Sequence, residues 1–258
     1  MKFLYLLLLT ALLPNAWAQS PEEKGLAIAV QADQRNLGWS DQQADMSMVL
    51  RNRHGQESKR SIRTKTLEIE NDGDKSLSIF DQPRDIKGTA FLSFTHAKKA
   101  DDQWLYLPAL KRVKRISSSN KSGPFMGSEF AFEDLTSQEV DKYTYRWLRD
   151  EQIDGRDSFV IERLPTYKHS GYKRQILWLD KGMYQPLLLE FYDRKNSLLK
   201  TLKFSDYNQY LGKYWRPNRM EMQNHQTGKS TLLAWSNYRF KAGLGSKDFN
   251  RNSLKRAR

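Results

Sequence analysis

Residue types that support catalysis are present in the sequence, but their spacing matches no catalytic arrangement. Adjacent carboxylates occur at Asp101-Asp102 and at Glu133-Asp134. Neighbouring residues on a strand point to opposite faces, so neither pair is predicted to work as a paired acid and base. Ser117-Ser118-Ser119 lies near Lys121, but no G-x-S-x-G turn surrounds a serine, and the segment is typical of a loop. We therefore predict no catalytic residues and expect that the protein is not an enzyme.

Metal binding and phosphate binding are equally unsupported by the sequence. The four histidines are isolated from one another and lack the spacing of a zinc site: His54, His96, His169 and His225. The segment SGPFMG, residues 122–127, has two glycines but lacks the lysine and hydroxyl residue of a phosphate-binding loop. We expect no metal and no other cofactor, and we interpret these glycines as turn residues.

The most informative stretch is WLYLPALKRVKRISSSNKSGPFMGSEFAFEDL, residues 104–135. It contains a cationic run in which four of five residues are basic: Lys111, Arg112, Lys114 and Arg115. This run is either a solvated strand or a contact for anionic headgroups or a partner protein. Two large apolar residues, Phe125 and Met126, then follow Gly123-Pro124 in a loop. They either mark a binding site or fold back to plug one end of the sheet.

The N-terminus predicts export. Lys2 precedes an apolar run from Phe3 to Leu13, and Ala16-Trp17-Ala18 has the small-x-small pattern of a cleavage site. The apolar run is too short to span a bilayer, which needs about 20 residues. We predict a secretory signal peptide over residues 1–18, cleaved after Ala18, and a mature protein in the periplasm.

Composition narrows the class of partner. One of the 43 basic residues lies in the signal peptide, so the mature chain carries 42 basic against 30 acidic residues, a net charge of +12. A basic protein is a candidate for nucleic-acid binding, but export makes anionic phospholipids or an acidic protein the expected partner. The chain has no cysteine, which excludes disulfides, thiolate chemistry and a lipid-modified N-terminal cysteine.

Hydrophobic patterning predicts one helix followed by a β-rich domain. Pro21 and the acidic residues after it predict a helix over residues 21–35. From residue 41 onward the period is two, with turn signals such as Asn71-Asp72-Gly73 and Asp154-Gly155. We predict about 10–11 strands in one antiparallel sheet over residues 19–245, with a β-sandwich as the alternative. The basic stretch 246–258 is predicted to be disordered.

Several of these strands are apolar on both faces and so need cover on both sides, for example residues 104–110 and 186–192. At this point the 104–135 stretch resembles the bacterial outer membrane lipoprotein-sorting proteins, within the wider superfamily of the lipoprotein carriers LolA and LolB. The similarity covers roughly residues 85–240, and the order of a helix followed by strands agrees with it. It implies an open antiparallel half-barrel whose concave side is covered by helices and accepts acyl chains.

The resemblance implies a non-enzymatic periplasmic carrier for lipid or lipoprotein cargo, with an RND-type inner-membrane exporter as partner. We expect the protein to be a monomer. On this basis the apolar cavity and its gate are predicted to involve Met46, Met48, Leu50, Leu67, Ile69, Phe125 and Met126. The cationic run would then contact headgroups or the partner. A sensor of lipids or envelope stress is the alternative function, and an enzyme acting on envelope glycans or lipids is a third.

Overall fold

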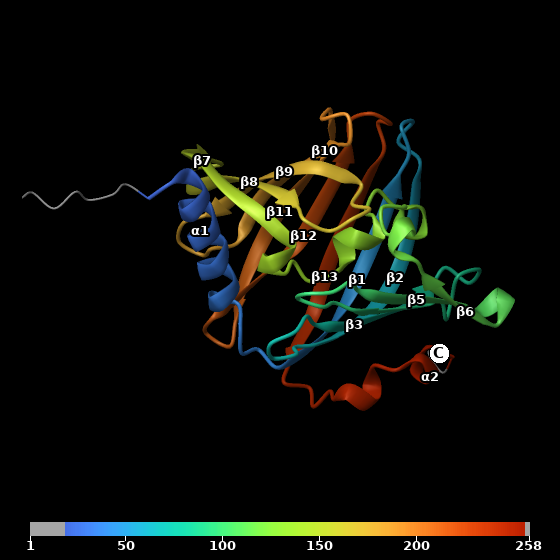
Figure 1. The fold of residues 1–258 in the computed structure, drawn as a ribbon. Coiled ribbons are helices and arrows are strands. Elements are labelled where there is room, and N and C mark those ends of the chain that lie inside the picture. Colours follow the sequence, from blue (N-terminus) through green and yellow to red (C-terminus); the bar gives the residue numbers. More distant parts are fainter. Residues whose placement is uncertain (1–18, 256–258) are drawn as a thin grey trace, which may run out of the picture.

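A computed structural model describes residues 19–255 and contains one sheet of thirteen antiparallel strands, with a helix, α1, beside it (Figure 1). The predicted signal peptide lies outside the described residues. The strands, in chain order, are β1 Asp41–Arg51, β2 Glu57–Leu67, β3 Lys75–Gln82, β4 Ala90–Phe94, β5 Asp102–Leu107, β6 Arg112–Ile116, β7 Tyr143–Ile153, β8 Arg156–Pro165, β9 Tyr172–Asp180, β10 Pro186–Asp193, β11 Leu198–Tyr210, β12 Tyr214–Asn224 and β13 Ser230–Phe240.

The sheet is not a simple meander, because its first and last strands pair with each other. Met48 on β1 lies opposite Leu233 on β13, and the strand order is β6-β5-β4-β3-β2-β1-β13-β12-β11-β10-β9-β8-β7. The two free edges are therefore β6 and β7, which follow one another in the chain. The predicted open antiparallel sheet is confirmed, whereas the expected 10–11 strands are too few. The cationic run supplies one of the additional strands, β6.

The helix α1, Pro21–Arg35, forms where the sequence predicts it. Ser20 caps its N-terminus, since its hydroxyl accepts from the Glu23 amide while the Glu23 carboxylate accepts from the Ser20 amide. The helix packs against β7, and Gly25 makes this approach possible. A Cβ at Gly25 would lie only 2.7 Å from the backbone nitrogen of Trp147. None of the helices in residues 19–255 is long and apolar enough to cross a membrane.

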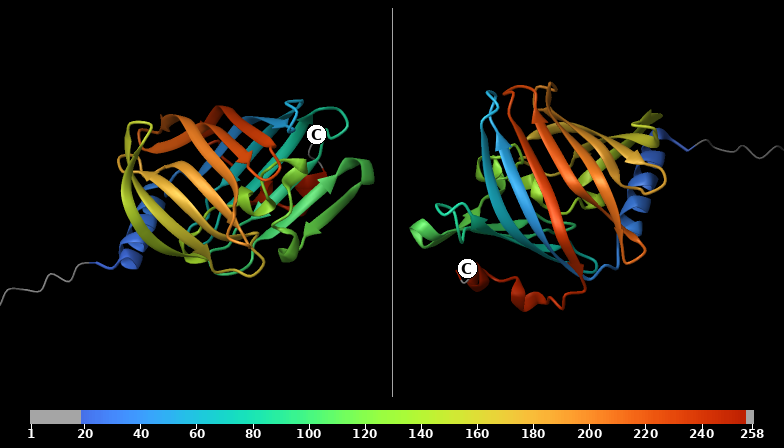
Figure 2. Two further views of the ribbon diagram at one scale, coloured as in Figure 1. Left: turned by 90° about the horizontal axis from the view of Figure 1, so that it is seen from above. Right: turned by 180° about the vertical axis from the view of Figure 1, so that it is seen from behind.

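Residues 117–142 connect the two free edges of the sheet and cross its concave side (Figures 1 and 2). We call them the crossing segment. It has no strand and consists of short 3-10 turns joined by loops: η2 Ser118–Asn120, η3 Phe125–Gly127, η4 Phe132–Leu135 and η5 Val140–Lys142. Its Phe125 and Phe130 belong to the largest apolar cluster, together with side chains from strands on both halves of the sheet. The concave side is thus filled largely by the chain itself.

The convex side carries a second apolar cluster, and the C-terminal residues belong to it. Phe249, which follows the short turn η6 (Ser246–Asp248), is 2% exposed. Leu254, in the helix α2 (Arg251–Lys255), is 0% exposed. They pack with Leu77 and Leu92. The prediction of disorder from residue 246 is therefore wrong for residues 246–255, because two apolar side chains among the basic ones attach this stretch to the sheet. Residues 256–258 lie outside the described residues.

Leu254→Ala tests this attachment. The substitution removes a fully buried side chain and should lower the free energy of unfolding by about 2–5 kcal/mol in urea denaturation. Leu211→Ala is the matched control, because Leu211 is exposed and should cost less than about 0.5 kcal/mol. Equal, small effects of both substitutions would contradict the attachment of α2 to the sheet.

Candidate functional site

The concave face of the sheet is the candidate binding surface. Three predicted cavity residues, Met46, Met48 and Leu50, lie on this face of β1, since all three belong to or pack against the large apolar cluster. The alternation of β1 places them there, because residues two apart on a strand share a face. Phe125 and Met126 of the crossing segment reach the same cluster from the opposite direction.

Two other predicted cavity residues lie elsewhere. Leu67 packs against the convex cluster, since Ile62 of the same strand faces the concave side and Leu67 lies five positions, an odd number, further along the strand. Ile69 follows the end of β2, is partly exposed, and belongs to none of the described apolar clusters. The prediction that these two residues line a concave cavity is therefore corrected: it continued the alternation of β2 on the wrong face and beyond the end of the strand.

The sequence left two alternatives for the loop that carries Phe125 and Met126: an exposed binding site, or a loop that folds back against the sheet. The burial of Phe125 favours the second alternative. Its ring is 1% exposed and lies 5.1 Å from that of Phe91 and 6.0 Å from that of Phe80, between centroids. Met126 has a left-handed backbone with φ of 50°, and its carbonyl accepts a 2.5 Å hydrogen bond from Nη1 of Arg60 on β2. The loop is thus held inside the half-barrel rather than exposed as a flap.

Buried polar contacts fix the crossing segment in place. Nζ of Lys200, on β11, lies 3.0 Å from Oδ2 of Asp134 and donates to the Glu129 carbonyl at 2.7 Å. The side chains of Lys200 and Asp134 are both 6% exposed. The Glu133 carboxylate accepts hydrogen bonds from Tyr167, Ser170 and the Gly171 amide, and its burial raises its pKa.

Asp101 makes a second buried contact, with two lysines of the crossing segment. Its carboxylate pairs with Lys142, and with Lys121 at 3.4 Å. The sequence analysis predicted only that the 101–102 and 133–134 pairs are not catalytic. The partners of Asp101, Glu133 and Asp134 lie far along the chain and have no spacing signal, so the sequence alone could not reveal these contacts.

The cationic run lies at the free edge of the sheet, and its Arg112 and Lys114 are the cross-strand partners of Leu107 and Leu105. Lys111, Arg112, Lys114 and Arg115 are all exposed, whereas Val113 and Ile116 anchor the strand. Arg115 pairs with Asp102 on β5 at 2.5 Å. The run is a solvated edge strand, and a contact with headgroups or a partner stays a prediction.

The helix α1 covers the other part of the concave side, and it does so with few buried side chains. Only Gly25 and Ile28 of α1 are buried, with Ile28 packing on Tyr143 and Ile161. Ala29 and Ala32 pack against the same cluster while partly buried. Two further contacts place cations over aromatic rings: Lys24 lies 3.3 Å from the centroid of the Trp147 ring, and Arg35 lies 3.9 Å from that of Tyr184. Such cation–π contacts stabilise exposed sites by only about 0.5–1 kcal/mol each.

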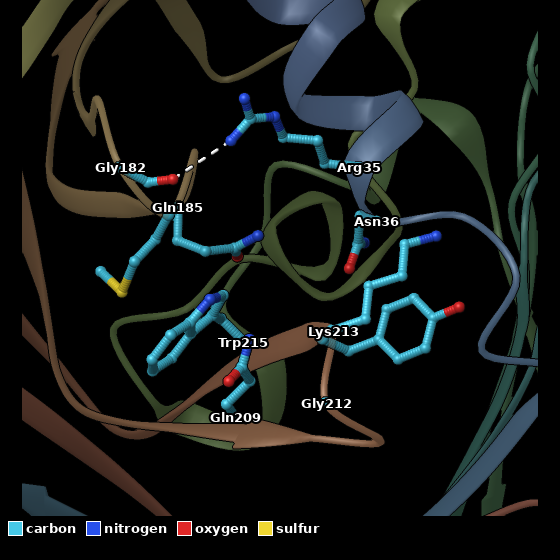
Figure 3. Close-up of a pocket in the computed structure, with 10 residues that line it drawn as sticks. Arg35, Asn36, Gly182, Gln185, Gln209, Gly212, Lys213 and Trp215 are labelled. Atoms are coloured by element: carbon cyan, nitrogen blue, oxygen red, sulfur yellow. Dashed lines mark hydrogen bonds between the residues drawn. The ribbon is translucent and has the colours of Figure 1, made fainter.

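A cavity of about 310 Å³ lies where α1 ends (Figure 3). It is bounded by the C-terminus of α1, the β9–β10 turn and the β11–β12 turn, and Arg35 closes one side by donating from Nη1 to the Gly182 carbonyl at 3.1 Å. Cationic, amide and apolar side chains line it together: Arg35, Asn36, Met183, Gln185, Gln209, Lys213, Tyr214 and Trp215. This volume is at the lower end for ligand pockets, and the mixed lining suits an anionic or polar group attached to an apolar one.

Carboxylates from separate elements lie near one another beside the crossing segment. Burial raises the pKa of Asp74, in the β2–β3 turn, to about 6, and it raises that of Glu139 to about 7. Burial also raises the pKa of Asp33 in α1. Repulsion by Glu68 and by neighbouring carboxylates acts in the same direction, whereas Arg216 and Lys142 oppose it. In the described residues, no cluster of histidines and carboxylates has the geometry of a metal site.

The open antiparallel sheet with one helix packed on it is a LolA-like fold. A LolA superfamily protein from Nitrosomonas europaea has this fold, with a TM-score of 0.70 at 23% identity over 89% of this chain and 98% of its own. A DUF1329 family protein from Desulfovibrio piger gives a TM-score of 0.87 at 33% identity, over 91% and 99%.

An outer membrane lipoprotein-sorting protein domain from Vibrio parahaemolyticus is 61% identical, over 91% of this chain and 99% of its own, and superimposes with a TM-score of 0.89. The chain therefore belongs to the outer membrane lipoprotein-sorting family. A family profile described as "uncharacterized protein" matches residues 72–256. No curated protein matches the sequence. The similarity that the 104–135 stretch suggested is confirmed, and it indicates a protein of the bacterial envelope.

Lys200→Met tests whether the buried ion pair holds the crossing segment. It leaves Asp134 buried without its cation, so the free energy of unfolding should fall by about 3–5 kcal/mol in urea denaturation. Lys203→Met is the matched control on the same strand, since Lys203 pairs with Asp154 at 2.7 Å in an exposed position and should cost less than about 1 kcal/mol. Equal losses of unfolding free energy in the two variants would contradict the expectation that the buried Lys200–Asp134 pair contributes more to stability than the exposed Lys203–Asp154 pair.

The raised carboxyl pKa values predict a pH dependence of stability. Between about pH 4 and pH 7 the folded state binds more protons than the unfolded state, because the pKa values of Asp74 and Glu139 are higher when folded. These two groups should therefore make the protein less stable as pH rises through that range. Glu139→Gln should reduce the fall in unfolding free energy between about pH 5 and about pH 7.5, whereas Glu70→Gln, at an exposed position, should not. If unfolding free energy depends on pH in Glu139→Gln as it does in the unmodified chain, the raised pKa of Glu139 is contradicted.

Proposed function

We propose that the mature chain is a non-enzymatic periplasmic carrier that binds the acyl chains of a lipid or lipoprotein on its concave face. The observation that carries this proposal is the unequal cover of that face: α1 rests on it through two buried residues, whereas the crossing segment is anchored by buried rings and ion pairs. The family membership and the signal-peptide pattern of residues 1–18 support a carrier that acts in the periplasm.

Acyl chains would replace α1 rather than the crossing segment. Tyr143, Tyr145, Ile161 and Leu179 pack beneath the helix, and lifting it would expose this apolar surface. Each methylene of cargo buried there would contribute about 0.8 kcal/mol, so one acyl chain of ordinary length outweighs the few contacts of α1. The crossing segment is then the fixed floor of the cavity, and α1 is its movable cover.

The cavity at the end of α1 would hold the polar part of the cargo. Arg35 and Lys213 supply positive charge, while Gln185 and Gln209 supply amides that donate or accept hydrogen bonds. Trp215 lies beside them and offers apolar surface to the first carbons of a chain. An anionic headgroup or a backbone segment of a lipoprotein would fit these groups.

Native mass spectrometry tests the proposal directly. The mature protein, purified gently or incubated with phospholipid vesicles, should carry an additional mass that corresponds to a lipid or lipid-modified peptide. A protein that carries no such mass, and takes none up from vesicles, would contradict the carrier function.

Gly25→Ala tests α1 as the cover. Alanine favours a helix over glycine by about 1 kcal/mol, but its Cβ would meet the β7 backbone at 2.7 Å, so the helix must move away from the sheet. Amide hydrogen exchange over residues 21–35 should increase severalfold, and transfer of a fluorescent phospholipid from donor vesicles should become faster.

Gly245→Ala is the matched control, because nothing lies within 4 Å of a Cβ at that glycine. It should leave both exchange and transfer unchanged. Increased exchange without faster transfer in Gly25→Ala would show that α1 moves but does not gate the cargo.

For a partner, we propose an inner-membrane exporter of the RND type, on the family resemblance alone. Affinity capture with the mature chain from solubilised inner membranes tests this proposal, and enrichment of such an exporter is the expected result. Capture that enriches no exporter would contradict it.

A further inference from the structure

The β5–β6 hairpin extends from the free edge of the sheet, and its tip projects beyond neighbouring elements in each view (Figures 1 and 2). The short turn η1, Pro108–Leu110, forms the tip. Leu110 is 68% exposed, the highest value among the large apolar side chains of the described residues. The tip is therefore apolar at its most exposed point, where a solvated turn would carry polar residues.

Cations follow the tip directly on β6. Lys111, Arg112 and Lys114 are exposed, and none of them forms an ion pair with another residue in the described range 19–255. Arg112 and Lys114 share one face of the hairpin with their cross-strand partners Leu107 and Leu105, and Arg115 lies on the other face. Positive charge thus surrounds the stem behind the tip, and the sequence from residue 103 to residue 128 contains no acidic residue.

The C-terminal helix α2 adds charge at the base of the same hairpin. It contacts β4, β5 and β6, and it is held there by the buried Leu254. Arg251 and Lys255 of α2 are both exposed. A stretch that the sequence suggested to be a disordered basic tail therefore positions its cations next to the cationic edge of the sheet.

Protection of an edge strand explains only part of this arrangement. Lysines on an edge strand discourage pairing with another chain, which accounts for cations on β6. It does not account for a leucine at the outermost point. The order of the groups, apolar at the tip and cationic behind it, is the order of a bilayer interface, where acyl chains lie beneath anionic headgroups. An acidic protein would pair with the cations but would leave Leu110 without a role.

We propose that the β5–β6 hairpin docks the protein on a bilayer surface containing anionic phospholipid, with Leu110 entering the interface and the β6 cations contacting headgroup phosphates. This docking is separate from the proposed cargo surface beneath α1, because α1 packs on β7, and β6 and β7 are the two opposite edges of the sheet. Its electrostatic part should weaken with added salt. Each cation near such a surface strengthens binding about fivefold, so three cations contribute about a hundredfold.

Vesicle flotation tests the docking. The mature chain should float with vesicles of phosphatidylcholine mixed with phosphatidylglycerol, and not with vesicles of phosphatidylcholine alone. The variant Lys111→Gln/Arg112→Gln/Lys114→Gln should bind the mixed vesicles about a hundredfold more weakly. The control Lys168→Gln/Lys173→Gln/Lys195→Gln makes the same change in net charge at three other exposed positions, and it should bind almost as the unmodified chain does.

Equal losses in the two triple variants would show that total charge, not the hairpin, controls binding, and would overturn the proposal. Unchanged vesicle binding in the hairpin variant would overturn it as well, because the β6 cations would then make no contribution to the membrane contact. Neither result depends on cargo, because flotation measures the membrane contact and native mass spectrometry measures the bound lipid.

Insertion of the tip has its own test. The chain contains no cysteine, so Leu110→Cys can carry a single environment-sensitive fluorophore, and Leu211→Cys at another exposed leucine serves as the control. Anionic vesicles should shift the emission of the label at position 110 to shorter wavelength and leave the label at position 211 unchanged. No shift at position 110 under conditions where the protein floats would overturn insertion of the tip.

Discussion

The pairing of β1 with β13 is the constraint on which the rest of the structure depends. It joins the beginning and the end of the sheet at its centre, so the free edges must be β6 and β7, which are consecutive in the chain. The connection between them cannot be a tight hairpin, because the width of the open half-barrel separates the two edges. A segment of 26 residues, 117–142, crosses that width instead, and its path over the concave side is a direct consequence of the strand order.

The concave face consequently has two covers with different physical attachments. The crossing segment contributes rings that pack at centroid distances of 5–6 Å, together with lysine–carboxylate pairs removed from water. The helix α1 contributes one buried isoleucine, two partly buried alanines, one glycine at close approach and two cation–π contacts near its ends. Burial of apolar area dominates adhesion between elements, so the segment adheres strongly and the helix weakly. In the proposed carrier, this division would let α1 lift while the buried rings and ion pairs of the segment stay in place, and the two covers meet only at η5 among the element contacts described.

Local patterns made much of this fold predictable. The capping residues of α1, the alternation of β1 and the Asp154-Gly155 turn, where both residues have positive φ, are properties of adjacent residues, and the sequence contains them. What could not be predicted depends on contacts between distant residues. The partner of Asp134 is 66 residues away, and the facing of Leu67 depends on how β2 pairs with its neighbours. The buried positions of Phe249 and Leu254 likewise require a sheet surface that no local pattern reveals.

The buried polar contacts of the crossing segment hold it in one position, which apolar packing alone would not do. A concave wall of methionine, leucine and phenylalanine side chains offers many positions of similar energy to a loop that carries further phenylalanines, because hydrophobic burial is not directional. An ion pair or a buried carboxylate is favourable in one position and costly in all others, since a displaced charge would stay buried without its partner. Lys200 with Asp134, and Glu133 with its three donors, therefore select a single register for the segment. The cost of burying these groups is offset by a segment that keeps one position, which the proposed carrier requires if α1 is to move above it.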